Sequence, residues 1–232
     1  MLAANRDEYY RRRTAPADFW GEILGGRDLE GGGTWMGITR TGRIAFLTNY
    51  RDPADNRQTP SRGELTSNYL QSTVHPKTYL KKLLPHGKEY KGFNLAVGNY
   101  DELWYFSNYG TDIQKLSPGV YGLSNHLLNS PWPKVERGLE KALPYFENPD
   151  SQKLLDLMYD SQQAPDEKLP NTGLSKEREK LLSSIFIKSS DYGTRCSTVI
   201  VIDENKKVNF TERIYNTCDF TFHDKNFEFQ IE

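Results

Sequence analysis

Short runs of β-branched and aromatic residues, separated by turns rich in glycine and polar residues, dominate the hydrophobic pattern of the chain. We expect such runs to form strands. They lie at residues 2–5, 34–39, 43–49, 93–98, 102–108, 112–116, 120–124, 197–203, 208–215 and 227–231. Arg40-Thr41-Gly42 predicts a hairpin between the second and third runs. Glu204-Asn205-Lys206 predicts a turn before 208–215.

Helical spacing of apolar residues marks the intervening parts of the chain. Leu80, Leu83 and Leu84 share one face of a predicted helix over 76–84, which follows a helical stretch at 63–71. Helical segments are also expected at 134–146, 154–159 and 176–187. Strands and helices grouped in blocks are typical of an α+β fold rather than of alternating βαβ units. Because no linker or repeat interrupts the pattern, we expect one domain over residues 1–232.

Composition and charge exclude several classes of protein. The chain carries 30 basic and 31 acidic residues, so no basic field favours nucleic acid, and no apolar run is long enough for a transmembrane span. The residues after Met1 do not form a signal peptide, and two cysteines make no disulfide framework. We therefore expect a cytoplasmic protein. Phosphate-loop, Rossmann and zinc motifs are missing, so no metal and no cofactor is expected.

Arginine is distributed unevenly along the chain. Ten of the fourteen arginines fall within residues 1–62, whereas the first lysine is Lys77. Arginine presents a planar fork that suits carboxylates and phosphates. Two interpretations stay open: structural pairs with the acidic residues of the same segment, or a binding site for an anionic group.

Polar residues gather beside several of the predicted strands. Three clusters lie at 4–8, 47–51 and 122–125, and a fourth, 194–198, opens another strand. Such clusters are either ordinary turn chemistry or side chains that meet in a cleft at a sheet edge. The presence of four such clusters favours the second interpretation, in which their side chains form one site.

The segment Asn5-Arg6-Asp7-Glu8 resembles the signature of the NRDE family, also called the transport-and-Golgi-organisation-2 family. Further blocks are similar to the same family, at 2–9, 26–30, 33–37, 47–51, 122–125, 131–135, 192–195 and 197–199. The family in turn resembles N-terminal-nucleophile (Ntn) amidohydrolases that use a terminal cysteine. This resemblance implies a four-layer αββα sandwich with two mainly antiparallel sheets between helical layers.

The resemblance also implies roles for five residues. Arg6 would stabilise a thiolate and Asp7 would orient the terminal amine. Asn49 and Asn125 would donate to an oxyanion, and Arg195 would hold the site by its charge. In an active, full-length form the chain would be a hydrolase acting on C–N amide bonds.

The chain departs from the family pattern at the nucleophile. Family members normally begin Met-Cys, followed by a strand and a turn, whereas here only three residues separate Met1 from the Asn-Arg-Asp-Glu block. We therefore expect the first strand and the nucleophile to be missing and the chain to be inactive. Neither Cys196 nor Cys218 has the α-amine that the chemistry uses. A missing strand would expose a sheet edge and permit self-association.

Two alternatives to an inactive amidohydrolase stay open. One is an intracellular binding or trafficking protein for an anionic, partly apolar metabolite, haem-like or lipid-like. The other is a structural or interaction domain without a pocket.

Overall fold

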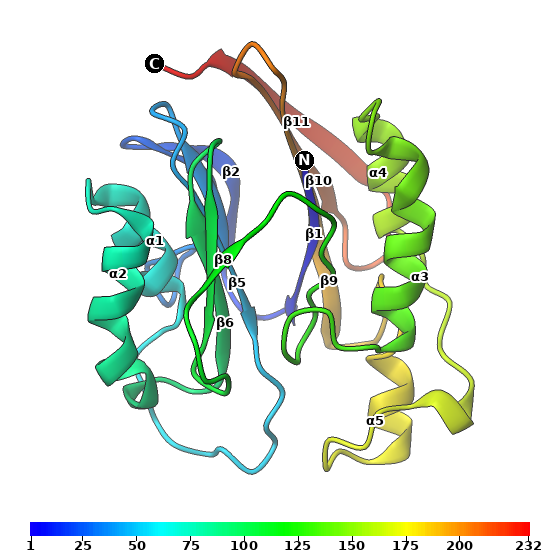
Figure 1. Ribbon diagram of the computed structural model, residues 1–232. Helices are drawn as coiled ribbons and strands as arrows, with labels where there is room; N and C mark the ends of the chain where they lie inside the picture. Colours follow the sequence, from blue (N-terminus) through cyan, green and yellow to red (C-terminus); the bar gives the residue numbers. More distant parts are fainter. The chain divides into compact units, whose positions relative to one another are not determined.

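The computed structural model describes residues 1–232 and shows an α+β fold with two antiparallel sheets and five α-helices (Figure 1). The chain divides into two compact units. Unit 1 comprises residues 1–12 and 131–231, and unit 2 comprises residues 13–130 with residue 232. Each unit holds one sheet and the helices that pack against it.

Unit 2 contains a seven-stranded sheet in the order β2-β3-β4-β5-β6-β7-β8. The predicted hairpin is confirmed: β4 and β5 pair around Gly42, whose φ of 77° is easy for glycine. Helices α1 and α2 fall where the helical spacing predicted them. The elements are β2 (Thr14–Trp20), β3 (Ile23–Asp28), β4 (Met36–Thr39), β5 (Ile44–Asn49), α1 (Gly63–Gln71), α2 (Pro76–Leu83), β6 (Phe93–Gly98), β7 (Leu103–Ser107) and β8 (Gln114–Leu116).

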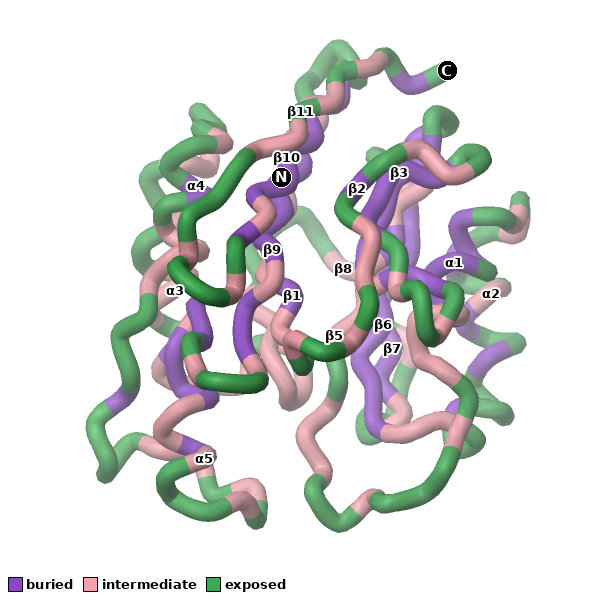
Figure 2. The backbone as a smooth tube through the Cα atoms, turned by 180° about the vertical axis from the view of Figure 1, so that it is seen from behind, coloured by how far each residue is buried: buried purple, intermediate pink, exposed green.

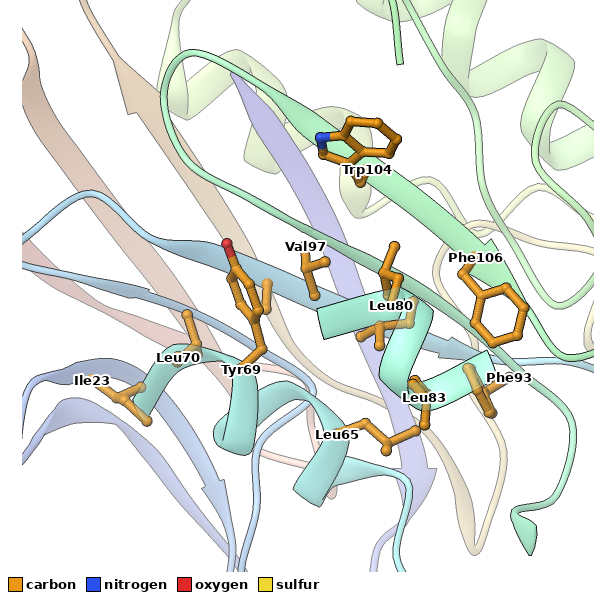
Figure 3. Close-up of a cluster of buried hydrophobic side chains, with 12 residues drawn as sticks. Ile23, Leu65, Tyr69, Leu70, Leu80, Leu83, Phe93, Val97, Trp104 and Phe106 are labelled. Carbon is orange, nitrogen blue, oxygen red and sulfur yellow. The ribbon is translucent and has the colours of Figure 1, made fainter. Parts of the chain in front are cut away.

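The core of unit 2 lies between this sheet and helices α1 and α2 (Figure 3). Leu65 and Tyr69 from α1 and Leu80 from α2 meet Phe93 and Val97 of β6, and all five are at most 3% exposed. Residues 93, 95 and 97 alternate onto the helical face of β6, so Asn94 points to the opposite face. Figure 2 shows β6 as a continuous buried stretch, and β7 is buried from Trp104 to Ser107.

Unit 1 contains a four-stranded sheet in the order β1-β9-β10-β11, with β1 at one edge. Leu154 and Leu155 of α4 pack on Val199 of β9 together with Ala3 of β1, so α4 covers one face of this sheet. The elements are β1 (Leu2–Tyr9), α3 (Pro133–Ala142), α4 (Ser151–Met158), α5 (Lys176–Leu181), β9 (Tyr192–Ile202), β10 (Lys207–Tyr215) and β11 (Phe222–Gln230). Short 3₁₀ turns occupy Leu84–Glu89, Leu143–Tyr145 and Asp166–Lys168.

Two predicted elements are wrong. Residues 120–124 form no strand, because backbone groups there bond to side chains and to a turn: Gly122 N donates to Asn129 Oδ1 (2.9 Å) and Asn129 N donates to Gly122 O (2.8 Å). The helix expected over 176–187 ends at Leu181. There the hydroxyls of Ser183 and Ser184 bond the carbonyls of the last turn, which competes with further helix.

Strand β2 is not among the runs predicted above. Pro16 lies within it, at a register shift between Ala15 and Asp18, and β2 is the outer strand of its sheet. An edge strand with a bulge tolerates a proline that lacks its N–H.

The α+β class with two antiparallel sheets is therefore confirmed, whereas the four-layer order and the single domain stay predictions. No helix in residues 1–232 has both the length and the apolar character that crossing a membrane requires.

Candidate functional site

The Asn-Arg-Asp-Glu segment lies in the body of strand β1 rather than at its end. Strand β9 runs antiparallel beside it, and the pairing shifts between Arg6 and Asp7: Arg6 is opposite Cys196, but Asp7 is opposite Thr194. Arg195 is the extra residue on β9, so the structure has a β-bulge at the signature. Bulges of this kind change the direction of the neighbouring side chains.

Asn5 ties three parts of unit 1 together. Its Nδ2 donates to the carbonyls of Met158 (2.8 Å) and Ile185 (2.9 Å), and its Oδ1 accepts from Ser197 Oγ (2.6 Å). The Ser197 hydroxyl also lies 2.9 Å from the Tyr215 hydroxyl. The side-chain amide of Asn5 thus links strand β1 to the end of α4, to the segment before β9 and to β9 itself. We did not single out Asn5 as a site residue, because its partners are remote in sequence.

Asp7 is held by hydrogen bonds and electrostatics within unit 1. Thr194 Oγ1 donates to Asp7 Oδ1 (2.6 Å) and accepts from the Ile187 amide (2.9 Å). Burial raises the pKa of the Asp7 carboxyl, although the positive charge of Lys134 and the bond from Thr194 act in the opposite direction. Asp7 is thus a partly buried carboxyl beside a buried lysine.

Arg195 holds the turn that follows β1. Its Nη1 donates to three carbonyl oxygens, those of Tyr9 (3.2 Å), Tyr10 (3.1 Å) and Arg12 (2.9 Å). A charged donor shared by three carbonyls fixes the path of this turn. The structure therefore gives Arg195 a positioning role in residues 9–12.

The two thiols differ in their surroundings. Cys196 is 5% exposed and lies beside Arg6 and close to Glu212 of β10. Burial first, and then the negative charge of Glu212, raise the pKa of the Cys196 thiol well above its ordinary value. Cys218 is exposed in the turn between β10 and β11. A buried thiol with a raised pKa is a poor nucleophile.

We expect iodoacetamide at neutral pH to alkylate the folded protein once, at Cys218. Cys196 should react only in denaturant, because its thiol is buried and remains protonated. Intact mass and peptide mapping measure both adducts. A folded protein whose Cys196 reacts as fast as Cys218 would contradict this description of the thiol.

Asn49 and Asn125 come together in unit 2. Asn125 Nδ2 donates to the carbonyl of Asn49 (3.0 Å), and the Arg51 amide donates to the carbonyl of Asn125 (2.7 Å). Asn49 is the last residue of β5 and is exposed. Of the five expected site residues, Arg6, Asp7 and Arg195 thus lie in unit 1, and the two asparagines lie in unit 2. A single cleft lined by all five stays a prediction.

A buried polar network holds the 122–130 loop on unit 2. Asn94, which is fully buried, donates from Nδ2 to Thr48 Oγ1 (3.0 Å) and to the His126 carbonyl (2.9 Å), and its Oδ1 accepts from the Tyr105 hydroxyl (2.6 Å). Tyr105 in turn accepts from the Leu128 amide (3.2 Å). We did not identify this network from the sequence, although an asparagine inside an apolar strand is a signal for it.

Three of the ten arginines in the first 62 residues, Arg43, Arg57 and Arg62, bind backbone carbonyls, which neither earlier interpretation anticipated. Arg43 Nη2 donates to the carbonyls of Tyr69 (3.1 Å) and Val74 (2.9 Å), and Arg62 Nη1 donates to that of Gly92 (2.8 Å). Arg57 combines both patterns: it pairs with Asp55 and donates to two carbonyls. These three guanidinium groups fix loops of unit 2.

No group of three or more His, Cys, Asp or Glu side chains in residues 1–232 is arranged to hold a metal ion. The features above define a two-sheet α+β protein with an NRDE segment on an edge strand. Comparison with known proteins agrees with that class. A family model described as "Transport and Golgi organisation 2" matches residues 1–217.

Named relatives match nearly the whole chain. A Transport and Golgi organization protein 2 homolog from Bos taurus is 42% identical over 238 residues, covering 92% of this chain and 85% of the bovine protein. The homolog from Homo sapiens is 37% identical over 255 residues, covering 100% and 92%. The Drosophila melanogaster protein is 27% identical over 251 residues, covering 94% and 87%. The chain belongs to the Transport and Golgi organisation 2 family, which confirms the NRDE resemblance.

Proposed function

We propose that this chain has an Ntn-type amidohydrolase ancestry and that these 232 residues do not hydrolyse amides. The observation that supports inactivity is the burial of Cys196. Burial and the negative charge of Glu212 raise the pKa of its thiol. An attacking cysteine needs a lowered pKa or an adjacent base.

Two of the expected catalytic residues donate hydrogen bonds to the protein's own backbone, which supports the same proposal. Arg195 donates to three carbonyls of residues 9–12, and the Asn125 amide donates to the Asn49 carbonyl. An oxyanion donor must aim at the place where substrate charge develops. Donors committed to the protein's own backbone favour a positioning role.

The second candidate function is binding or trafficking of an anionic, partly apolar metabolite, haem-like or lipid-like. The bovine, human and fly relatives are named for transport and Golgi organisation, which favours such a role over catalysis for this chain. The excess of arginine in residues 1–62 favours an anionic group on the ligand, although Arg43, Arg57 and Arg62 fix loops of unit 2.

Binding of N-lauroylglycine tests this second function, because the molecule combines an acyl chain, an amide and a carboxylate. We expect the protein to bind it about tenfold more tightly than its uncharged amide, N-lauroylglycinamide, a difference of about 1.4 kcal/mol. Titration calorimetry measures both affinities. Equal affinities would contradict the proposal that the ligand carries an anionic group. If neither compound binds, the proposal that the ligand is partly apolar is contradicted as well.

We also propose that the two units act as one cytoplasmic domain that can self-associate. Unit 1 combines residues 1–12 with residues 131–231, so it needs segments from both parts of the chain. Strand β1 pairs only with β9 within its sheet, and an edge strand is a template for pairing with a second chain.

A further inference from the structure

Lys188 places its ammonium group among three aromatic rings of unit 1. Its Nζ lies 4.5 Å from the ring centroid of Tyr159, 4.7 Å from that of Phe220 and 5.3 Å from that of Phe186. The Nζ also donates to the Tyr159 hydroxyl (3.1 Å). We call Tyr159, Phe186 and Phe220 the aromatic cage. Nothing in the proposed function uses it.

The rings of the cage pack against one another and against Tyr215. The rings of Tyr159 and Phe186 are 4.4 Å apart, and those of Phe186 and Phe220 are 5.8 Å apart with an interplanar angle of 73°. Tyr215 closes the cage from the sheet, with its ring 4.7 Å from Phe186 and 5.6 Å from Tyr159. Phe186 is fully buried, and Tyr215 is 4% exposed. The rings are therefore held in place before any ligand arrives.

Phe220 adopts a backbone conformation that is rare for a bulky residue. Its φ is 59°, in the left-handed region. The Phe220 amide donates to the Asn216 carbonyl (2.8 Å), and the Asn216 amide donates to the Thr221 carbonyl (2.8 Å), so the turn maintains this conformation. Strain of this kind concentrates at functional sites and ligand clamps. Here it holds the third ring of the cage.

The distances in the cage are those of a cation site. All three Nζ-to-centroid distances, 4.5 Å, 4.7 Å and 5.3 Å, lie within the about 6 Å over which an aromatic face attracts a cation. Aromatic faces attract cations, and aromatic cages recognise quaternary ammonium groups. Lys188 is exposed, and its ammonium group is held by the three rings and by one hydrogen bond to the Tyr159 hydroxyl, so a ligand cation would compete with it for the same rings.

We propose that the aromatic cage is a binding site for a quaternary ammonium group of the trimethylammonium type. Lys188 occupies the site in the free protein as a tethered cation and competes with the ligand. The tether gives the Lys188 head group a high effective concentration. Removal of the Lys188 charge should therefore open the cage and increase the affinity for the ligand.

Calorimetric titration with choline chloride tests this proposal on the whole protein. We expect Lys188→Ala to bind choline at least about tenfold more tightly than the unsubstituted protein does. The uncharged carbon isostere of choline should bind neither protein, because it has the shape of choline without the charge. Sodium chloride at the same concentration corrects for ionic strength.

Variants of the cage provide the matched controls. In the Lys188→Ala background, Phe220→Leu and Tyr159→Leu should each abolish the gain in choline affinity, and thermal melts identify which variants remain folded. Two independent cage variants keep the test decisive if one of them fails to fold. The proposal is overturned if Lys188→Ala does not bind choline, if it binds the uncharged isostere equally well, or if a folded cage variant retains the affinity.

Discussion

Replacement of Asn5 by alanine is expected to lower the free energy of unfolding by about 3 kcal/mol and the melting temperature by roughly 6–12 °C. The Asn5 amide makes hydrogen bonds to the carbonyls of Met158 and Ile185 and to the hydroxyl of Ser197. Alanine removes all three, and each partner group left without its bond costs about 1 kcal/mol. Thermal melts followed by circular dichroism measure the change.

Two further substitutions separate this explanation from a general sensitivity to mutation. Asn205→Ala changes an exposed turn residue and should alter the stability by less than about 0.5 kcal/mol. Asn5→Asp keeps the acceptor for Ser197 but places a carboxylate against two carbonyl oxygens, so it should destabilise at least as much as Asn5→Ala. A melting temperature for Asn5→Ala within about 2 °C of the unsubstituted protein would show that these bonds contribute little.

Substitution of Asn94 by leucine is expected to cost about 4 kcal/mol and to loosen the 122–130 loop. Leucine has the same branching and the same number of side-chain heavy atoms but leaves the Tyr105 hydroxyl without its acceptor and the His126 carbonyl without its donor, at a fully buried position. Hydrogen exchange of the Leu128 and Asn129 amides should accelerate, because both amides bond within this loop or to Tyr105.

Thr48→Val provides a graded comparison for the loop. It removes one member of the network, the hydroxyl that donates to the Ser124 carbonyl (2.7 Å), so its effect should be smaller than that of Asn94→Leu. If Asn94→Leu leaves the exchange of the loop amides unchanged, the network does not hold the loop.

Local sequence patterns predicted the elements whose stability depends on near neighbours. The hairpin around Gly42 follows from a turn and two β-rich runs, and α2 follows from the spacing of its leucines. Residues 120–124 have the composition of a strand, but their hydrogen bonds go to side chains such as that of Asn129. Composition alone does not reveal that competition.

The roles of the signature residues depend on partners that are remote in sequence. The partners of the Asn5 side-chain amide are 153 and 180 residues away, and those of Arg195 lie 183 to 186 residues before it. The sequence indicated that these residues belong together. The resemblance suggested chemistry, whereas the hydrogen bonds of Asn5 and Arg195 show both of them holding backbone.

We propose that these 232 residues do not cleave amides, because the NRDE signature and its neighbours support loops. Release of glycine from N-lauroylglycine, measured at a protein concentration well above that of any trace contaminant, tests whether amides are cleaved. The matched control is the double variant Cys196→Ala/Cys218→Ser, which has no thiol. We predict that glycine release by the unsubstituted protein equals that of the double variant and of buffer. Faster release that the double variant loses would show that a thiol of this chain cleaves amides.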